Sequence, residues 1–230
     1  MAIYALSDLH LSLGVDKPMD IFGKEWDGYV EKMKENWQSI VSEDDLVIIP
    51  GDVSWATYID EAYEDFKLIN SLNGKKVILK GNHDYWWTTL TKMEKFLAEN
   101  GFDTIKILNN NAIEFEDAAI CGTRGWWYRD EQSEDDEKIL DRERKRLILA
   151  LESAVSLKKE RIIVGLHYPP LDINSPNRDF FEIMKEYGVD TCVYGHLHSF
   201  AHKNAVEGEI EGIKLKLVAG DYVKFSPVLV

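Results

Sequence analysis

The sequence predicts an α/β fold, a four-layer α/β/β/α sandwich of two mixed β-sheets, in a single domain over residues 1–230. Short apolar runs rich in β-branched residues alternate with longer segments of helical period, which is typical of parallel strands joined by helices. Two further blocks have the pattern of antiparallel strands. With 45% hydrophobic residues, a chain of 230 residues can fill one sizeable core.

Five apolar runs have the length and composition of buried strands. Each run leads directly into a polar or glycine-containing turn. We therefore expect the turns after these strands to converge on one crevice of the sheet structure. The runs cover residues 2–6, 46–49, 76–79, 162–166 and 190–194.

Two segments between these runs have a helical period. In residues 59–69 apolar side chains recur at spacings of four, three and three, and residues 134–157 repeat that pattern. The second segment overlaps an acidic stretch, residues 130–137, in which six of eight side chains are carboxylates. Such a run is usually solvated, so we interpret it as an exposed helix start and assign it no further role.

Two blocks predict antiparallel strands. Residues 104–108 and 112–116 flank three consecutive asparagines, which tolerate left-handed turn conformations, so we expect a hairpin there. Residues 200–217 predict further strands, broken by glycines. His202 falls in this alternating pattern, and we interpret it as a core or surface histidine.

The composition excludes some classes of partner. The chain has 27 basic and 41 acidic side chains and a net charge of −14, which disfavours long nucleic acids. No apolar run approaches the roughly 20 residues that span a bilayer, so we expect no membrane partner. The start shows no secretory signal pattern, and we expect Cys121 and Cys192 to be buried and reduced. These features predict a cytoplasmic protein and leave its oligomeric state unknown.

Five of the six histidines lie in polar turns that follow predicted strands. Residues two apart at a strand end project to the same side, so such pairs can offer two ligands to one locus. Each residue alone could instead cap a turn, but capping does not explain five such turns after five strands. The turns read Asp8-Leu9-His10, Gly51-Asp52, Gly81-Asn82-His83-Asp84, Gly165-Leu166-His167 and Gly195-His196-Leu197-His198.

This set of imidazoles and oxygens suits two divalent metal ions. Two cations about 3.5–4 Å apart need a bridging anion, and Asp52, alone after its strand, is the candidate. Mixed nitrogen and oxygen ligation favours Mn²⁺ or Fe, and is compatible with Zn²⁺, whereas Ca²⁺ prefers oxygen alone. Glycines at 51, 81 and 195 let the backbone turn sharply beside the metals.

In their order, these turns resemble the signature of the calcineurin-like metallophosphoesterase superfamily: D-x-H, G-D, G-N-H-D/E, a lone histidine after a strand, and G-H-x-H. The resemblance covers Asp8 to His198. It implies the double-sheet sandwich and the hydrolysis of a phosphoester by a hydroxide that bridges two metals.

The resemblance also implies a role for each matching residue. His83 would contact the phosphate and assist departure of the leaving group, and Asp84 would orient the His83 ring. One metal would be held by Asp8, His10 and His198, the other by Asn82, His167 and His196, with Asp52 bridging.

The chain departs from two related classes. In the Ser/Thr protein phosphatase branch, Gly-Asp continues into Val-Asp-Arg-Gly, whereas here Val53-Ser54-Trp55-Ala56 follows and the phosphate-clamping arginine is missing. Haloacid-dehalogenase-type phosphatases need a second aspartate where His10 stands. The sequence also lacks a Gly-rich phosphate loop of the P-loop or dinucleotide type. These classes are therefore disfavoured.

One arginine and several tryptophans are candidate substrate contacts. Arg124 is a candidate for phosphate binding because a guanidinium matches phosphate geometry, with a surface salt bridge as the alternative. Trp55, Trp86 and Trp87 follow two of these turns, and Trp126 and Trp127 follow Arg124; they could stack on a nucleobase or pack in the core. We therefore predict a small phosphorylated substrate, a phosphodiester or nucleotide-type compound.

Two alternatives stay open. The same centre could act on phosphomonoesters, or the fold could serve as a non-catalytic binding scaffold. A scaffold has no need of His83, and every signature position is filled, which favours an enzyme. Residues 12–30 form a long connection before the next helix, and a lid over a nearby site is one interpretation of it.

Overall fold

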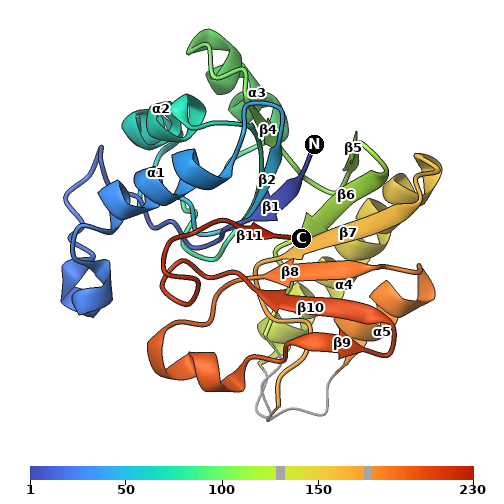
Figure 1. Cartoon of the computed structure of the whole chain (residues 1–230). Helices are drawn as coiled ribbons and strands as arrows, with labels where there is room; N and C mark the ends of the chain where they lie inside the picture. Colours follow the sequence, from blue (N-terminus) through green and yellow to red (C-terminus); the bar gives the residue numbers. More distant parts are fainter. Residues whose placement is uncertain (128–132, 174–177) are drawn as a thin grey trace.

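The computed structural model describes residues 1–127, 133–173 and 178–230, and two mixed β-sheets form its centre (Figure 1). The first sheet has five strands in the order β11-β1-β2-β3-β4, parallel except for β11, which runs antiparallel to β1. Its strands are β1 (Ile3–Ala5), β2 (Leu46–Pro50), β3 (Lys75–Leu79), β4 (Ile105–Ile107) and β11 (Val228–Leu229).

The second sheet has six strands in the order β5-β6-β7-β8-β10-β9. Its four inner strands are parallel, and the edge strands β5 and β9 are antiparallel to their neighbours. The strands are β5 (Ala112–Phe115), β6 (Ala118–Thr123), β7 (Arg161–Leu166), β8 (Thr191–Tyr194), β9 (Gly208–Ile210) and β10 (Ile213–Leu217).

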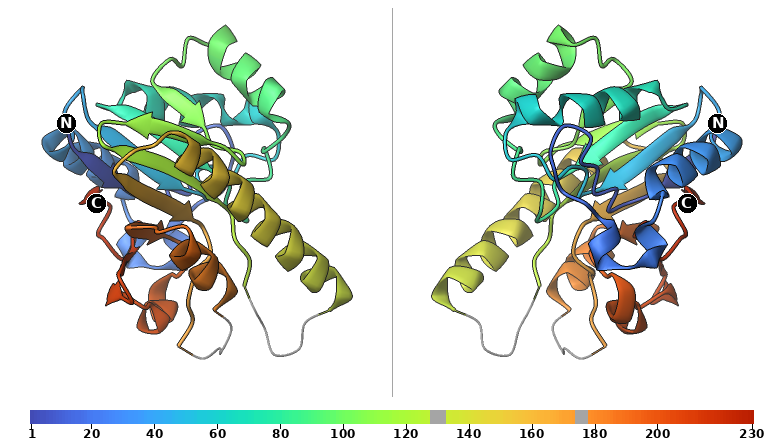
Figure 2. Two further views of the ribbon diagram at one scale, coloured as in Figure 1. Left: turned by 90° about the vertical axis from the view of Figure 1, so that its right-hand side faces the viewer. Right: turned by 90° about the vertical axis from the view of Figure 1, so that its left-hand side faces the viewer.

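Helices cover the outer faces of both sheets, so the layers follow the predicted α/β/β/α order (Figure 2). None of the helices within the described residues is long and apolar enough to cross a membrane. The first sheet carries α1 (Tyr29–Ile40), α2 (Tyr63–Ser71) and α3 (Leu90–Glu99); the second carries α4 (Glu134–Ser156) and α5 (Asp179–Glu186). Short 3₁₀ helices are η1 (Asp20–Phe22), η2 (Lys24–Trp26), η3 (Ile59–Ala62) and η4 (Ser199–Asn204).

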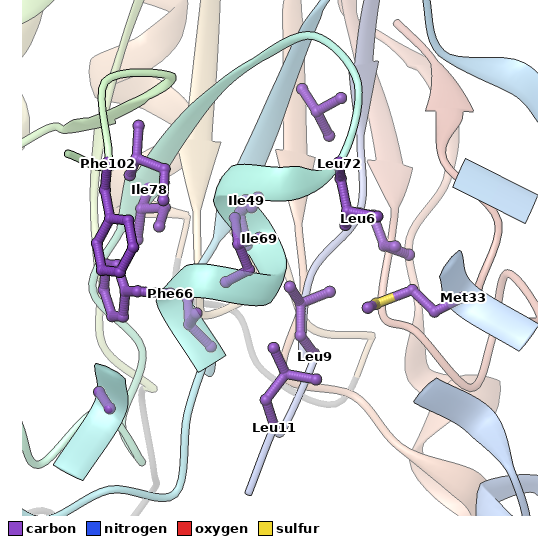
Figure 3. Packing of buried hydrophobic residues seen from close by; sticks show 14 of the residues in the cluster. Leu6, Leu9, Leu11, Met33, Ile49, Phe66, Ile69, Leu72, Ile78 and Phe102 are labelled. Atoms are coloured by element: carbon purple, nitrogen blue, oxygen red, sulfur yellow. The ribbon is translucent and has the colours of Figure 1, made fainter. Parts of the chain in front are cut away.

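The alternation of side chains along each strand divides the core into three clusters. In β2, Val47 and Ile49 belong to the cluster under the helices, whereas Leu46 and Ile48 belong to the cluster between the sheets. Figure 3 shows Ile49 beside Ile69 of α2. Because both faces of the central strands are covered, these strands consist mostly of apolar residues, which explains why the sequence shows continuous apolar runs.

The predicted hairpin around the three asparagines is wrong. β4 pairs in parallel with β3 of the first sheet, and β5 pairs antiparallel with β6 of the second, so the asparagines carry the chain from one sheet to the other. Asn110 does adopt a left-handed conformation, with φ 64°. A turn signal shows where the chain reverses but not which distant strand each arm will pair with.

Residues 200–204 also differ from the prediction. They belong to η4, so His202 lies on a helical turn and not in a strand. Farther along, β9 and β10 pair antiparallel as the sequence suggests.

The acidic segment begins a helix as predicted. Ser133 caps α4 by accepting a hydrogen bond from Asp136 N–H, and the Asp136 side chain accepts from Ser133 N–H in return. The carboxylates of residues 134–137 occupy the first turn, where they complement the helix dipole. Residues 130–132 of the segment lie outside the described residues.

Candidate metal centre

The turns after the parallel strands of both sheets meet at one edge of the sandwich. Backbone hydrogen bonds join the two sheets there, from Ser7 N–H to Val218 O at 2.8 Å and from Gly220 N–H to Ser7 O at 2.9 Å. The candidate ligands gathered there are Asp8, His10, Asp52 and Asn82 from the first sheet and His167, His196 and His198 from the second.

One group of ligand atoms comes from Asp8, His10 and His198, which lie within 4.8 Å of one another. The Nε2 atom of His198 is 3.1 Å from Asp8 Oδ1 and 3.3 Å from His10 Nε2. Asp8 and His10 are buried, whereas the His198 side chain is 28% exposed. This is the set that the family resemblance assigns to one metal, and it opens to solvent on the His198 side.

A second group lies beside the first. The Nε2 atom of His167 is 2.6 Å from Asn82 Oδ1, and His196 Nδ1 is 2.9 Å from the same oxygen. Asp52 Oδ2 is 3.4 Å from His167 Nε2 and 3.7 Å from His10 Nε2. Asp52 therefore faces both groups at once, as a bridging ligand must.

The free oxygen of Asp52 shows that these residues fit a metal. Asp52 Oδ2 is buried and accepts no hydrogen bond from the described residues, while Oδ1 accepts one from His83 N–H at 2.8 Å. A buried carboxylate oxygen without a partner is costly, and a cation among these atoms would remove that cost. Imidazole nitrogens together with carboxylate and amide oxygens suit a divalent transition metal.

Groups outside the centre determine which imidazole nitrogen faces it. His167 Nδ1 can donate to Pro50 O at 3.1 Å, and His198 Nδ1 to Asp221 Oδ1 at 2.9 Å, which leaves both Nε2 atoms free to bind a metal. Asp221 Oδ2 also lies 3.2 Å from His202 Nε2. Sequence reasoning missed Asp221, although Gly220-Asp221 after β10 repeats the Gly-Asp pattern of Gly51-Asp52.

Asp84 does not orient the His83 ring, contrary to the prediction. Its two oxygens accept hydrogen bonds from the backbone N–H groups of Gly81, Asp52, Val53 and Ser54 and from the indole N–H of Trp86. His83 Nδ1 is buried without a hydrogen-bond partner among the described residues. Asp84 instead ties the turn after β2 to the turn after β3, so it positions Asp52 through the backbone.

Four proposed ligands hold left-handed backbone conformations that side chains other than glycine rarely adopt. Asp8 has φ 58°, His10 44°, Asp52 51° and His196 72°. Conformations of this kind cost on the order of 1 kcal/mol or more and persist where the surrounding structure enforces them. Because four such residues lie at one edge, we infer that the fold tolerates this backbone strain to direct the proposed ligands toward one another.

Close backbone approach explains two of the glycines. A Cβ atom at Gly81 would collide with the backbone N and side-chain Oδ1 of Asp52. A Cβ atom at Gly195 would collide with Ser7 Oγ and Asp8 Oδ2. The absence of a side chain at these glycines thus lets the turns that carry the proposed ligands approach one another closely.

Burial sets the ionisation of the centre. It lowers the pKa of His10 to about 3, of His167 to about 4 and of His196 to about 2, so these rings are neutral and able to bind a metal at pH 7. Burial also raises the pKa of Asp52 well above its usual value, and the nearby charges of Asp8 and Asp84 add to this. For His198, burial is outweighed by the charge of Asp8 and by hydrogen bonds to Asp221 and Asp8, which raise its pKa to about 10.

A family model of the calcineurin-like phosphoesterases matches residues 1–200 of the chain. The chain belongs to this family. It is accordingly a phosphoester hydrolase, and the binding-scaffold alternative is set aside. A search of curated proteins gave no significant match.

Solved structures share the fold of this phosphoesterase over nearly its whole length. A protein of unknown function from Aquifex aeolicus is 18% identical with a TM-score of 0.53, covering 99% of this chain and 95% of that one. A phosphopantetheinyl hydrolase from Mycobacterium tuberculosis is 14% identical with a TM-score of 0.55, covering 100% and 95%. At these identities the likeness establishes the fold.

A pocket of about 250 Å³ opens beside the candidate metal centre of the phosphoesterase. His10, His83 and His198 form its polar wall. The rest of the lining is mostly apolar, and most of it comes from the connection over residues 12–30, which thus lies against the site. The apolar lining residues are Met19, Phe22, Trp26 and Trp55.

The predicted substrate tryptophans divide between pocket and core. The Trp55 ring stacks on His10, with centroids 4.9 Å apart and planes at 21°, and it is 4.6 Å from the His83 ring. Trp86 is only 2% exposed, packs edge-on against Phe66 and donates to Asp84. Trp86 therefore has no face for a substrate, and its position corrects the expectation.

Trp26, in the connection over residues 12–30, was not singled out by the sequence. Its ring meets those of His10 and His198 edge-on, at 5.7 and 5.8 Å. Tyr29, at the start of α1, donates a hydrogen bond from its hydroxyl to His10 O at 2.7 Å. The sequence signal that could have identified Trp26 is the group of aromatic residues that follows the Asp8-Leu9-His10 motif.

Arg124 lies outside this pocket. Its guanidinium is over the Trp126 ring at 4.7 Å and 3.7 Å from the buried carboxylate of Glu143 on α4. Its backbone oxygen accepts hydrogen bonds from His167 N–H and Tyr168 N–H, which anchors the turn after β7. The side chain, 15% exposed, lines a separate cavity.

Proposed function

We propose that this phosphoesterase hydrolyses a small phosphodiester or nucleotide-type substrate with two divalent metal ions. The observation that carries the proposal is Asp52 Oδ2, buried without a hydrogen bond and facing imidazole nitrogens of both ligand groups. Asp8, His10 and His198 would hold one ion, and Asn82, His167 and His196 the other, with Asp52 between them. Mn²⁺ or Fe suits these donors, and Zn²⁺ is compatible with them.

The bound metals would lower the pKa of a water molecule and polarise the phosphoryl group. The chain's own residues hold the ligands in place. Asp221 and Pro50 O hold the His198 and His167 rings in the orientation that presents Nε2. Asp84 fixes the backbone of the two turns that present Asp52 and Asn82.

His83 is placed to serve the leaving group. Its ring lines both the centre and the apolar pocket, at 5.8 Å from the His10 ring and 4.6 Å from the Trp55 ring. Burial lowers the pKa of His83, and the negative charge of a substrate phosphoryl group beside the ring would favour its protonated form. Proton donation from a positioned histidine is worth typically 10²–10⁴ in rate.

The pocket supports a substrate with an apolar or aromatic leaving group. Trp55, which is half-buried, has its ring 4.6 Å from the His83 ring, and such an aromatic surface accepts a base or another flat group. A plain phosphomonoester with a small alcohol would leave this pocket empty. We therefore favour hydrolysis of a phosphodiester or nucleotide-type substrate over a general phosphomonoesterase activity.

The test is a substrate panel assayed with Mn²⁺, Fe²⁺ and Zn²⁺ in turn. It compares a bis-aryl phosphate, the matching mono-aryl phosphate, nucleotides and a phosphopantetheine ester. We expect metal-dependent turnover with preference for the diester or nucleotides. Turnover of the monoester alone would overturn the substrate assignment, and the absence of metal-dependent turnover throughout would overturn the mechanism.

A further inference from the structure

A second cavity, of about 260 Å³, lies at the carboxyl ends of β3 and β6, against α4. None of the seven proposed metal ligands lines it. Its walls carry three cationic side chains and one carboxylate, together with hydroxyl and amide groups from the turns. The charged lining residues are Lys80, Arg124, Arg146 and Glu143, and the polar ones are Thr88, Thr123, Asn109 and Asn110.

The carboxylate of Glu143 is already engaged. Glu143 is fully buried; Oε2 accepts from Thr123 Oγ1 at 2.7 Å, and Oε1 accepts from Arg146 at 2.6 Å. Arg124 lies farther off, with NH2 3.7 Å from Oε1. The Nε atom of Arg124 is buried and has no hydrogen-bond partner among the described residues.

The lining of this cavity therefore carries uncompensated positive charge. Three cations against one carboxylate leave a formal excess of 3 − 1 = 2. The side chains of Arg124 and Arg146 are 15% and 38% exposed, so solvent screens the excess only in part. An anion with two charges and several acceptor oxygens would satisfy both the charge and the donors, and a phosphate group is such an anion.

The cavity also adjoins the metal centre through the backbone. Lys80 directly precedes Gly81 and Asn82, and the backbone oxygen of Arg124 accepts from His167 N–H at 3.1 Å. An anion held there would lie next to the turns that carry two of the proposed ligands.

We propose that this cavity is a second anion site that binds a phosphate-class dianion through Lys80, Arg124 and Arg146. The ligand is either a second, unreacting phosphoryl group of the substrate or free phosphate. The assignment of the ligand as a phosphoryl group of the substrate rests on the proposed function. The binding of a phosphate-class dianion in the cavity does not.

The binding test is calorimetric titration of the Mn²⁺-loaded protein with inorganic phosphate. Arg146→Gln should lower the number of phosphates bound per chain by one relative to the unaltered protein. Lys145→Gln, the same change one residue away on an exposed side chain paired with Asp141, should keep that number. Equal stoichiometry in the Arg146→Gln variant and the unaltered protein would overturn the site.

Lys80→Gln serves as a second variant if Arg146→Gln fails to fold, which far-UV circular dichroism would reveal. The loss of one phosphate is read as a difference between variants, so it is independent of whether the metal centre itself binds phosphate or turns over any ester. Failure of the site and failure of the proposed function are thus told apart.

The source of the ligand is read from kinetics on an ester with a second phosphoryl group and on the same ester without it. If the substrate supplies the anion, Arg146→Gln raises the KM of the doubly phosphorylated ester at least tenfold. The KM of the ester without the second phosphoryl group stays unchanged. If both KM values stay unchanged while one phosphate is lost from the titration, the substrate source is overturned and the ligand is free phosphate.

Discussion

The two sheets contribute different chemistry to the proposed metal centre. The first sheet supplies every oxygen donor of the proposed set and a single imidazole. The second sheet supplies only imidazoles. The donors are Asp8, Asp52, Asn82 and His10 on one side and His167, His196 and His198 on the other.

This difference shows that the proposed metal centre depends on the packing of the two sheets against each other. Neither sheet has a complete ligand set for a metal, and each proposed ion draws on both. Asp8 and His198, whose Oδ1 and Nε2 atoms lie 3.1 Å apart, are separated by 190 residues. The carboxylates of the centre come from one sheet, while three of its four imidazoles come from the other.

The largest effect should follow from neutralising the bridging carboxylate of the first sheet. We expect Asp52→Asn to lose at least one metal per chain and nearly all turnover, because an amide bridges two cations poorly. Elemental analysis and rate measurement check this. Asp45→Asn, the same change at a buried aspartate before β2, should keep both metals. Full metal content in Asp52→Asn would refute the bridging role.

Substitution of His83 tests whether the first sheet also supplies the histidine that donates a proton to the leaving group. We expect His83→Ala to keep the metals and to lose about 10²–10⁴ in kcat. The loss should shrink on an ester whose leaving group needs no proton. Unchanged kcat on the ordinary ester would remove His83 from the reaction.

Asp221 supports an imidazole of the second sheet from outside the centre. Asp221→Asn should weaken metal affinity about 10–100-fold, because the carboxylate orients His198 and makes it more basic. Titration with Mn²⁺ measures the change. Asp190→Asn, at the other end of the same sheet, is the control; an equal loss in both variants would argue against a specific role for Asp221.

The buried histidines and Asp52 should titrate in opposite directions in metal-free protein. His10, His167 and His196 have folded pKa values of about 3, 4 and 2, lowered by burial, so the unfolded chain binds more protons below about pH 6.5. Each such histidine lowers the free energy of unfolding by about 1.4 kcal/mol per pH unit as pH falls from about 6.5 toward 4.

Asp52 has a raised pKa, so it acts in the opposite direction: its contribution is present at low pH and is lost as pH rises above 3.8 through its folded pKa. We therefore expect metal-free Asp52→Asn to lose stability more steeply than the unaltered protein between pH 6.5 and 4. Urea unfolding at several pH values in the presence of a chelator measures both slopes. Identical slopes would contradict the assignment of opposite signs.

The smallest effect should come from a substitution in the apolar pocket beside His10, His83 and His198. Trp55→Ala should raise KM for an aryl or nucleotide substrate about 2- to 10-fold, with metal content unchanged, because it removes one stacking face. Tyr58→Ala, an exposed aromatic outside the pocket, is the matched control. A change in kcat alone would show that Trp55 acts through His10 or His83 and does not hold the substrate.

Much of the fold was accessible from sequence because the central strands are buried on both faces. Five continuous apolar runs and the turns after them identified five strands and all seven ligand candidates that the structure brings together. The pairing of β4 and β5 was not accessible, since two strands joined by a turn can still enter different sheets.

The roles of single side chains were less predictable. Asp84 follows His83 directly, yet its hydrogen bonds go to the turn after β2, which only the packing of the two turns decides. The contact of Arg124 with Glu143 likewise depends on how α4 docks on β6, a feature of tertiary structure with no local signal.

The pairing of the first strand with the last has a consequence for folding kinetics. Tyr4 of β1 lies opposite Leu229 of β11, and Ser7 bridges to Ala219, so the strand that carries Asp8 is fixed by contacts across almost the whole chain. Contacts of such long sequence separation slow folding because loop-closure entropy must be overcome before they form. Recovery of metal binding in refolding should therefore follow the formation of these long-range contacts, so metal binding would report that the first and last strands have paired.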